Sequence, residues 1–181
     1  HYHIVVRIDV DQAKSWSDEE VARRWMQVFS GPSLMHQYLG NADLTSAELE
    51  WVAELFATWR QRLGDLAWFM RCLNEPIARL ANAEDHCTGR FWEGRFKSQA
   101  LLDARAVLAC MAYVDLNPIR AAIAKTPEQS DYTSIQERIL HPEESSLRPF
   151  AEQEAEGIPF NLKDYLELVD WGGRELKCHK R

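Results

Sequence analysis

The hydrophobic and polar positions at the start of the chain follow the pattern of a β-strand. Residues 1–10 are rich in β-branched and aromatic side chains and contain no Gly or Pro, which is typical of strands. Because successive side chains of a strand point to opposite faces, His1 and His3 are expected on the same face. Residues 95–102 predict a second strand.

Farther along the chain, apolar residues recur at the three- and four-residue spacing of amphipathic helices. Capping sequences precede two of these segments, Ser-Asp-Glu-Glu at 17–20 and Thr-Ser-Ala-Glu at 45–48. Asp103 is an N-cap candidate for a later helix, which Pro118 should end or kink. We therefore expect helices at about residues 18–30, 46–63, 66–80 and 104–117.

The C-terminal part of the chain has a different composition. Residues 126–157 are dominated by Pro, Ser and Glu, which predicts a surface or linker segment. One short helix is expected after it, at residues 162–169. We therefore expect little regular secondary structure in residues 126–181.

Length and composition describe an ordinary globular protein. The chain has 181 residues, of which 46% are hydrophobic and 27% charged, which fits one compact domain with extensions. It has no run of about 18 apolar residues, and its first residues have neither the charged head nor the apolar run of a signal peptide. The four cysteines form no Cys-x-x-Cys pair. We expect reduced thiols, no membrane partner and a cytoplasmic location.

The net charge of −7 argues at first against nucleic acid, because Lys and Arg contacts to phosphates supply most non-specific affinity. The charge is unevenly distributed, however. Residues 1–85 and 126–181 each carry five more acidic than basic side chains, whereas residues 86–125 hold six Lys/Arg and three Asp/Glu. Such a basic centre can bind DNA locally. A solvated basic face is the alternative interpretation.

One pair of residues could carry chemistry on DNA. Tyr113 and Asn117 are four apart on the helix that ends near Pro118, so they share a face. A tyrosine that attacks a phosphodiester forms a phosphotyrosine, and a nearby divalent cation polarises the phosphate. The Asn117 amide with His1 and His3 would suit Mg²⁺ or Mn²⁺. Each residue alone also has a structural explanation, as core tyrosine, helix-end asparagine or packed histidines.

Cations alternate with aromatics between Gly89 and Ser98. Aromatic side chains beside phosphate contacts are what single-stranded DNA binding uses. The alternative is a turn whose aromatic side chains pack inward. With one basic residue from the later helix end, the candidate DNA-binding residues are Arg90, Trp92, Arg95, Phe96, Lys97 and Arg120.

Three segments, in this order along the chain, resemble motifs of the HUH single-tyrosine transposases, in particular the REP-associated tyrosine transposases. His1-Tyr2-His3 is similar to the family's His-hydrophobic-His motif. Residues 90–98, Arg-Phe-Trp-Glu-Gly-Arg-Phe-Lys-Ser, resemble its W-x-G-R-F-K-S segment. Residues 113–121, Tyr-Val-Asp-Leu-Asn-Pro-Ile-Arg-Ala, resemble its Y-[IV]-x-x-N-P-[IV]-[RK]-A signature, the most specific of the three.

The resemblance implies an α+β fold, a small ferredoxin-like domain in which the histidine-bearing strand faces the tyrosine helix. We expect the catalytic domain at 1–135, with residues 11–60 as a large helical insertion, and an acidic C-terminal extension at 136–181. Members of the family have a strand, a helix and a further strand before the histidine motif. We therefore expect this chain to be N-terminally truncated.

In function, the resemblance implies metal-dependent cleavage and rejoining of single-stranded DNA, often folded into a hairpin. Tyr113 would form a 5′-phosphotyrosine link and leave a free 3′-hydroxyl, and His1, His3 and Asn117 match the metal ligands. Related enzymes often form homodimers. Two alternatives are a catalytically inactive, sequence-specific DNA-binding module and a structural fragment with no activity of its own.

Overall fold

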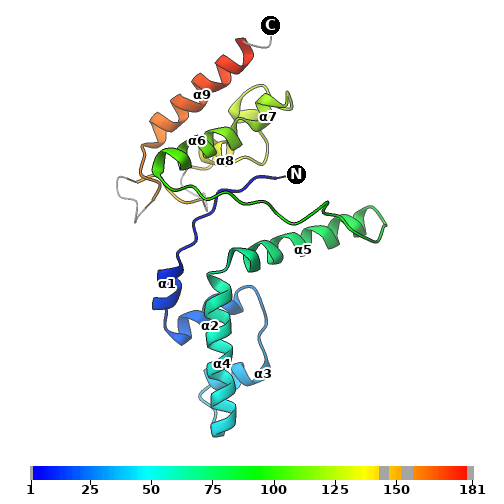
Figure 1. Cartoon of the computed structure of the whole chain (residues 1–181), viewed down its shortest axis with the longest axis vertical. Helices are drawn as coiled ribbons and strands as arrows, with labels where there is room; N and C mark the ends of the chain where they lie inside the picture. The colour runs from blue at the N-terminus through cyan, green and yellow to red at the C-terminus, as the bar shows by residue number, and fades with distance from the viewer. Residues whose placement is uncertain (1, 143–146, 152–156, 179–181) are drawn as a thin grey trace. The chain divides into compact units, whose positions relative to one another are not determined.

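A computed structural model describes residues 2–142, 147–151 and 157–178, with the side chains of 175–178 left out of the description. The chain forms two compact units. Arg7–Lys97 is called the tryptophan unit below, and His1–Val6 together with Ser98–Arg181 is called the tyrosine unit. Each unit is described by itself, and the helices of both are labelled in Figure 1.

The predicted α+β, ferredoxin-like fold is wrong. The structure is 60% helical with about 1% strand, and the one β-bridge in its described part joins Phe150 to Ile158. Residues 2–9 and 95–102 contain no strand, although their composition favours one. Strand propensity reflects packing on a sheet rather than an intrinsic backbone preference. Without a partner strand among the described residues, these segments therefore do not form strands. Ile4 and Val6 are accordingly 45% and 44% exposed.

The tryptophan unit consists of five helices within its described residues. Their bounds are α1 Val10–Ser15, α2 Asp18–Met26, α3 Ser33–Leu39, α4 Ser46–Leu63 and α5 Leu66–Glu84. The predicted helices at 18–30, 46–63 and 66–80 are thereby confirmed, with small differences at their ends. Val10, which the strand prediction included, instead begins α1, because the Asp9 carboxylate caps the backbone N–H of Gln12 at 2.9 Å.

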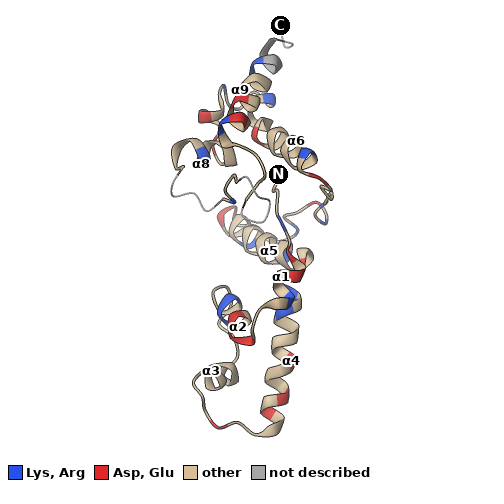
Figure 2. Ribbon diagram, turned by 90° about the vertical axis from the view of Figure 1, so that its left-hand side faces the viewer, with Lys and Arg blue, Asp and Glu red and all other residues tan. Residues whose placement is uncertain are grey.

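Capping determines where the two best-predicted helices begin. The Ser17 hydroxyl accepts from the backbone N–H of Glu20 at the start of α2. Thr45 and Glu48 form a reciprocal capping box at the start of α4. Acidic and basic residues are neighbours along the α2 ribbon (Figure 2), and the Glu20 carboxylate pairs with Arg23 and Arg24.

Aromatic rings fill the core of the tryptophan unit. The Trp25 ring stacks on Trp59 with 5.0 Å between centroids and an interplanar angle of 6°, and on Trp68 at 6.0 Å. The Arg62 guanidinium lies 4.1 Å from the Trp68 ring centroid. Since α2, α4 and α5 each contribute one of these rings, the stack joins three helices into one core.

The tyrosine unit contains the later helices. Their bounds are α6 Ala104–Asp115, α7 Asn117–Arg120, the 3₁₀-helix η1 Pro127–Gln129, α8 Ser134–Leu140 and α9 Leu162–Cys178. The helix expected at 104–117 is confirmed, whereas residues 126–157 were wrongly predicted to be surface or linker throughout. Ile135 on α8 is 1% exposed and Val169 on α9 is fully buried. Both pack in one core with Met111 of α6.

The C-terminal part is therefore packed on the tyrosine helix rather than appended to it. The predicted boundaries of 1–135 and 136–181, and the insertion at 11–60, stay predictions. None of the helices in the described ranges combines the length and the apolarity needed to cross a membrane.

Candidate functional site

Tyr113 lies near the C-terminal end of α6, with its side chain half exposed. The helix starts at Ala104 because the Asp103 carboxylate accepts from the backbone N–H of Ala106 at 2.7 Å. Met111 belongs to the apolar face that packs into the core, whereas Tyr113 is 48% exposed. The phenol hydroxyl can therefore meet a ligand from solvent.

Two basic side chains of the same unit lie against the Tyr113 ring. The His3 imidazole meets it edge to face, with 6.3 Å between ring centroids and an interplanar angle of 84°. The Arg120 guanidinium lies 4.5 Å from the ring centroid, within the range of a cation–π contact. Because guanidinium groups match phosphate geometry, this cluster places a group able to bind phosphate beside a phenol hydroxyl.

Asn117 follows at the junction of α6 and α7. Leu116 keeps right-handed helical dihedral angles between the two helices, and Pro118 lies in the first turn of α7. The helical path continues, because Leu116 donates to the Ala112 carbonyl and its own carbonyl accepts from Arg120. Asn117 therefore stays about one turn from Tyr113, as the four-residue spacing predicted.

Two of the three predicted metal ligands belong to the described residues. His3 and Asn117 belong to the tyrosine unit, while His1 lies outside the described residues. An imidazole with an amide oxygen is a donor set that a divalent cation accepts. Among the described residues there is no group of three or more His, Cys, Asp and Glu side chains able to hold a metal ion. The metal site stays a prediction.

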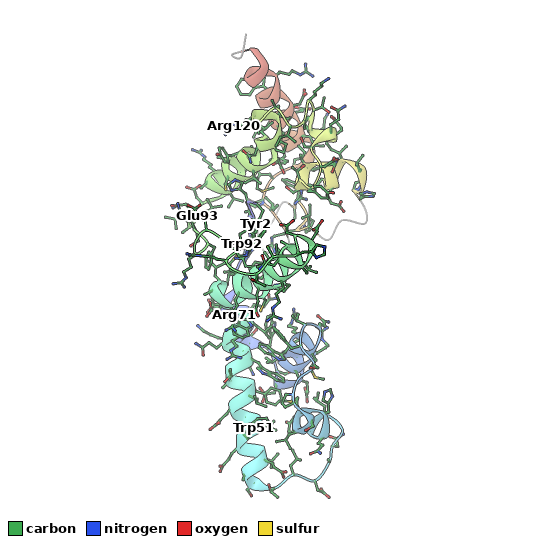
Figure 3. All side chains as sticks on the ribbon, turned by 90° about the vertical axis from the view of Figure 1, so that its right-hand side faces the viewer. Tyr2, Trp51, Arg71, Trp92, Glu93 and Arg120 are labelled. Atoms are coloured by element: carbon green, nitrogen blue, oxygen red, sulfur yellow. The ribbon has the colours of Figure 1, made fainter. Side chains whose placement is uncertain are left out.

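The basic and aromatic segment belongs to the tryptophan unit, where two hydrogen bonds tie it to α5. The Trp92 indole N–H donates to the Asn74 carbonyl at 3.0 Å, and Figure 3 shows Trp92 beside α5. The Asn82 amide donates to the Gly89 carbonyl at 3.1 Å. Gly89 has φ of +126°, which other residues rarely adopt. The segment is thus a turn built on a helix.

The side chains of this segment divide by type. The basic residues Arg90, Arg95 and Lys97 are exposed, and Trp92 and Phe96 are half-buried. Phe91 is 43% exposed and meets the Trp92 ring edge to face at 4.8 Å. The cations face solvent, as the DNA-binding interpretation expects, while Trp92 packs partly inward, as the interpretation of a turn with packed aromatic side chains expects.

Sequence reasoning missed one buried polar residue next to the tyrosine. Asp115 is fully buried, and its carboxylate accepts from the Ser134 hydroxyl at 2.7 Å and from the Ile135 backbone N–H at 3.1 Å. The Tyr165 hydroxyl donates to it at 2.5 Å. The signal was a single acid at the end of an otherwise apolar helical stretch, and such acids are rarely buried without partners.

The surroundings of Asp115 keep its partners in defined charge states. Burial, followed by the neighbouring Asp115 carboxylate, raises the pKa of Tyr165, so its hydroxyl remains a donor. Burial also lowers the pKa of Arg138, while the negative charge of Asp115 acts in the opposite direction. The Arg138 guanidinium donates to the Arg148 carbonyl at 2.9 Å. Asp115 is thus the centre of a buried polar cluster.

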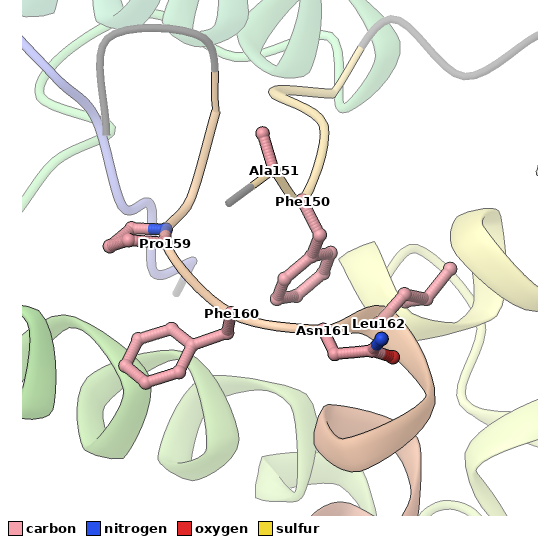
Figure 4. A pocket seen from close by; sticks show the side chains of 6 residues that line it. All are labelled: Phe150, Ala151, Pro159, Phe160, Asn161 and Leu162. Atoms are coloured by element: carbon pink, nitrogen blue, oxygen red, sulfur yellow. The ribbon is translucent and has the colours of Figure 1, made fainter. Parts of the chain in front are cut away.

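A hollow of the tyrosine unit lies just before and at the start of α9 (Figure 4). Its lining is Phe150, Ala151, Pro159, Phe160, Asn161 and Leu162. The Asn161 side chain accepts from the backbone N–H of Lys163 at 2.8 Å, so it caps the helix. None of these described lining residues has an ionisable side chain.

Comparison of the chain with protein-family models, curated proteins and solved structures gives no match. Its function is therefore inferred from the residue motifs and from the contacts around Tyr113.

Proposed function

We propose that the chain is a transposase-type DNA strand transferase that cleaves and rejoins single-stranded DNA through Tyr113. The observation that carries this proposal is the cluster at the end of α6. There the half-exposed Tyr113 ring lies 4.5 Å from the Arg120 guanidinium and 6.3 Å from the His3 ring. The three sequence motifs support it, because they resemble the HUH single-tyrosine transposases in kind and in order.

In the proposed reaction the Tyr113 hydroxyl oxygen attacks a DNA phosphorus atom. The new bond joins the Tyr113 oxygen to the 5′-phosphate, and the bond from phosphorus to the 3′-oxygen breaks. The phenol gives up its proton to solvent, and the 3′-oxygen takes up a proton to become a 3′-hydroxyl. Attack by a 3′-hydroxyl on the phosphotyrosine reverses these steps and rejoins DNA. No oxidant, reductant or nucleotide cofactor is needed, because one phosphodiester is exchanged for another.

The candidate residues have separate roles in this proposal. Arg120 binds the scissile phosphate and offsets its negative charge. His3 and Asn117, together with His1, would hold Mg²⁺ or Mn²⁺, which supplies positive charge at the phosphate. The exposed cations Arg90, Arg95 and Lys97 bind the DNA backbone, and Trp92 and Phe96 present ring faces to unpaired bases.

The substrate class follows from the same residues. Single-stranded DNA, including strands folded into hairpins, exposes unpaired bases to the aromatic rings and phosphates to the cations. A homodimer and a cytoplasmic location complete the proposal. The thiols of Cys72, Cys87 and Cys110 form no disulfide within the described residues, which fits a reducing compartment.

The test is formation of a covalent adduct. The chain is incubated with Mn²⁺ and a hairpin DNA labelled at its 3′ end, and the products are separated under denaturing conditions. We expect a labelled protein band that is lost in Tyr113→Phe and kept in Tyr132→Phe, because the Tyr132 side chain is fully exposed in the same unit. An adduct that persists in Tyr113→Phe contradicts the assignment. Salt-sensitive binding without an adduct would favour the inactive DNA-binding module.

A further inference from the structure

Helix α9 contacts residues 113–121, the segment that begins at Tyr113 and resembles the family signature, at two places. At the first, Tyr165 of α9 donates a hydrogen bond to Asp115, which lies two residues after Tyr113. Residues two apart on a helix point about 200° away from each other. Asp115 therefore faces the core while Tyr113 faces solvent, in agreement with exposures of 0% and 48%.

The second contact lies farther along α9, at Gly172 and Gly173. A Cβ atom placed on Gly172 would lie 3.1 Å from Cδ1 of Leu116, and one placed on Gly173 would lie 3.5 Å from Cδ2 of the same leucine. Glycine is less favourable than alanine inside a helix, so two consecutive glycines call for a reason. Close approach of α9 to Leu116 supplies it.

These two contacts lie between Tyr113 and the other residues of this segment that the proposed reaction uses, Asn117 and Arg120. Asp115 ends α6, Leu116 links it to α7, and Asn117 and Arg120 follow on α7. Since Tyr113 lies on α6 and Arg120 on α7, the angle at Leu116 sets how the guanidinium lies over the phenol ring. A helix that holds Asp115 and Leu116 also holds that angle.

We propose that α9 is a positioning element of the tyrosine site, acting through the Tyr165–Asp115 hydrogen bond and the packing of Gly172 on Leu116. This inference rests on the proposed function of Tyr113. Asp115 and Tyr165 are positioning residues, because Asp115 faces the core, on the opposite side of α6 from Tyr113, and Tyr165 is buried against it. Their effect reaches the reaction through the placement of Tyr113 relative to Arg120.

The first test uses Tyr165→Phe, which removes one hydroxyl oxygen, with Tyr132→Phe as the matched control at a fully exposed tyrosine. Displacement of reacting groups by about 1 Å can slow a reaction by two orders of magnitude. For a single lost hydrogen bond we expect adduct formation to slow about tenfold. Hairpin affinity should stay within about twofold and unfolding should remain cooperative. A rate no slower than that of Tyr132→Phe overturns the proposal.

A second variant covers the case in which Tyr165→Phe fails to fold. Gly172→Ala improves helix propensity but pushes a methyl group against Leu116. We expect α9 to stay helical by circular dichroism while adduct formation slows with little change in hairpin affinity. An unchanged rate in a folded Gly172→Ala chain contradicts the proposed packing role.

A readout independent of activity separates this proposal from the proposed function. The chain has five tyrosines, so 3-fluorotyrosine labelling gives few ¹⁹F resonances, and Tyr113→Phe assigns the one of interest. We expect that resonance to shift or broaden in Tyr165→Phe and in Gly172→Ala but not in Tyr132→Phe. If the unmodified chain forms no adduct, the proposed function fails, and the resonance still decides positioning. An unchanged Tyr113 resonance in both variants overturns the proposal.

Discussion

The two units of the chain are stabilised in different ways. The tryptophan unit is held by stacked rings from α2, α4 and α5, with its helix caps at exposed positions. The tyrosine unit contains a buried carboxylate, Asp115, whose partners come from α8 and α9. The hydrophobic gain from burying rings depends on the area buried and has no direction, whereas a buried charge requires each of its hydrogen bonds. The proposed nucleophile, Tyr113, is located in the unit that contains the buried charge.

The largest expected effect comes from removing a ring of the tryptophan core. Trp59→Ala should destabilise the tryptophan unit by about 3–5 kcal/mol, because truncation of a buried Trp leaves a cavity. Trp59 is 3% exposed, while Trp51 on the same helix is 42% exposed, so Trp51→Ala is the control and should change stability by less than about 0.5 kcal/mol. Hydrogen exchange resolved by segment measures both. Equal losses in the two variants would contradict the assignment of the core.

A smaller effect, confined to the tyrosine unit, is expected from Asp115→Asn. The substitution keeps the shape but removes the charge that accepts three hydrogen bonds and offsets Arg138, which should cost about 2 kcal/mol. Faster exchange should appear in α8 and α9 and leave α4 unchanged. Asp43→Asn, the same change at an exposed position, is the control. Loss of protection spread evenly over both units would show that the comparison between them is mistaken.

Some features of these two units could be predicted from the sequence and others could not. The helices α2 and α4 were predictable because capping residues and apolar spacing are local signals. The sheet was wrong because residues 2–9 have strand composition but no neighbouring strand in the described chain. The role of Asp115 was hidden because its partners Ser134 and Tyr165 are 19 and 50 residues away. Helix α8 was missed because its seven residues stand in a segment rich in Pro, Ser and Glu.

The candidate site, like the fold, was predictable only in part. The spacing of Tyr113 and Asn117 correctly placed them one helical turn apart, since that depends on the helix alone. The contact between His3 and Tyr113 joins positions far apart in sequence, and the expectation that brought them together was the family resemblance. The contact of the Arg120 guanidinium with the Tyr113 ring was not predicted.

Arg120→Lys tests the guanidinium over Tyr113 and should change activity more than stability. Lysine keeps the charge but loses the planar group that stacks on the ring and pairs with phosphate. We expect adduct formation to slow about tenfold, which corresponds to about 1.4 kcal/mol. Arg105→Lys, at an exposed position of the same helix as Tyr113, is the control. Equal rates for the two variants would remove Arg120 from the site.

The smallest effect concerns a carboxylate of the tryptophan unit, Glu20, whose side chain is 28% exposed. The side-chain hydrogen bond from Arg23, with the charges of Arg23 and Arg24, lowers the pKa of Glu20 from 4.5 to about 2. A lowered pKa in the folded state stabilises above pH 4.5, and this contribution is lost as the pH falls from 4.5 to about 2. Glu20→Gln should therefore lower the unfolding temperature slightly at pH 7 and hardly at pH 2. A difference that is as large at pH 2 would exclude ionisation as its cause.

The central claim is that Tyr113 is the nucleophile, and peptide mapping of the adduct tests it most directly. After reaction with hairpin DNA and nuclease trimming, trypsin should release the peptide 106–120 carrying a nucleotide, with fragmentation locating the phosphate on Tyr113. Tyr113 is the single tyrosine of that peptide. A nucleotide found on any other residue, or an adduct that leaves this peptide unmodified, would contradict the claim.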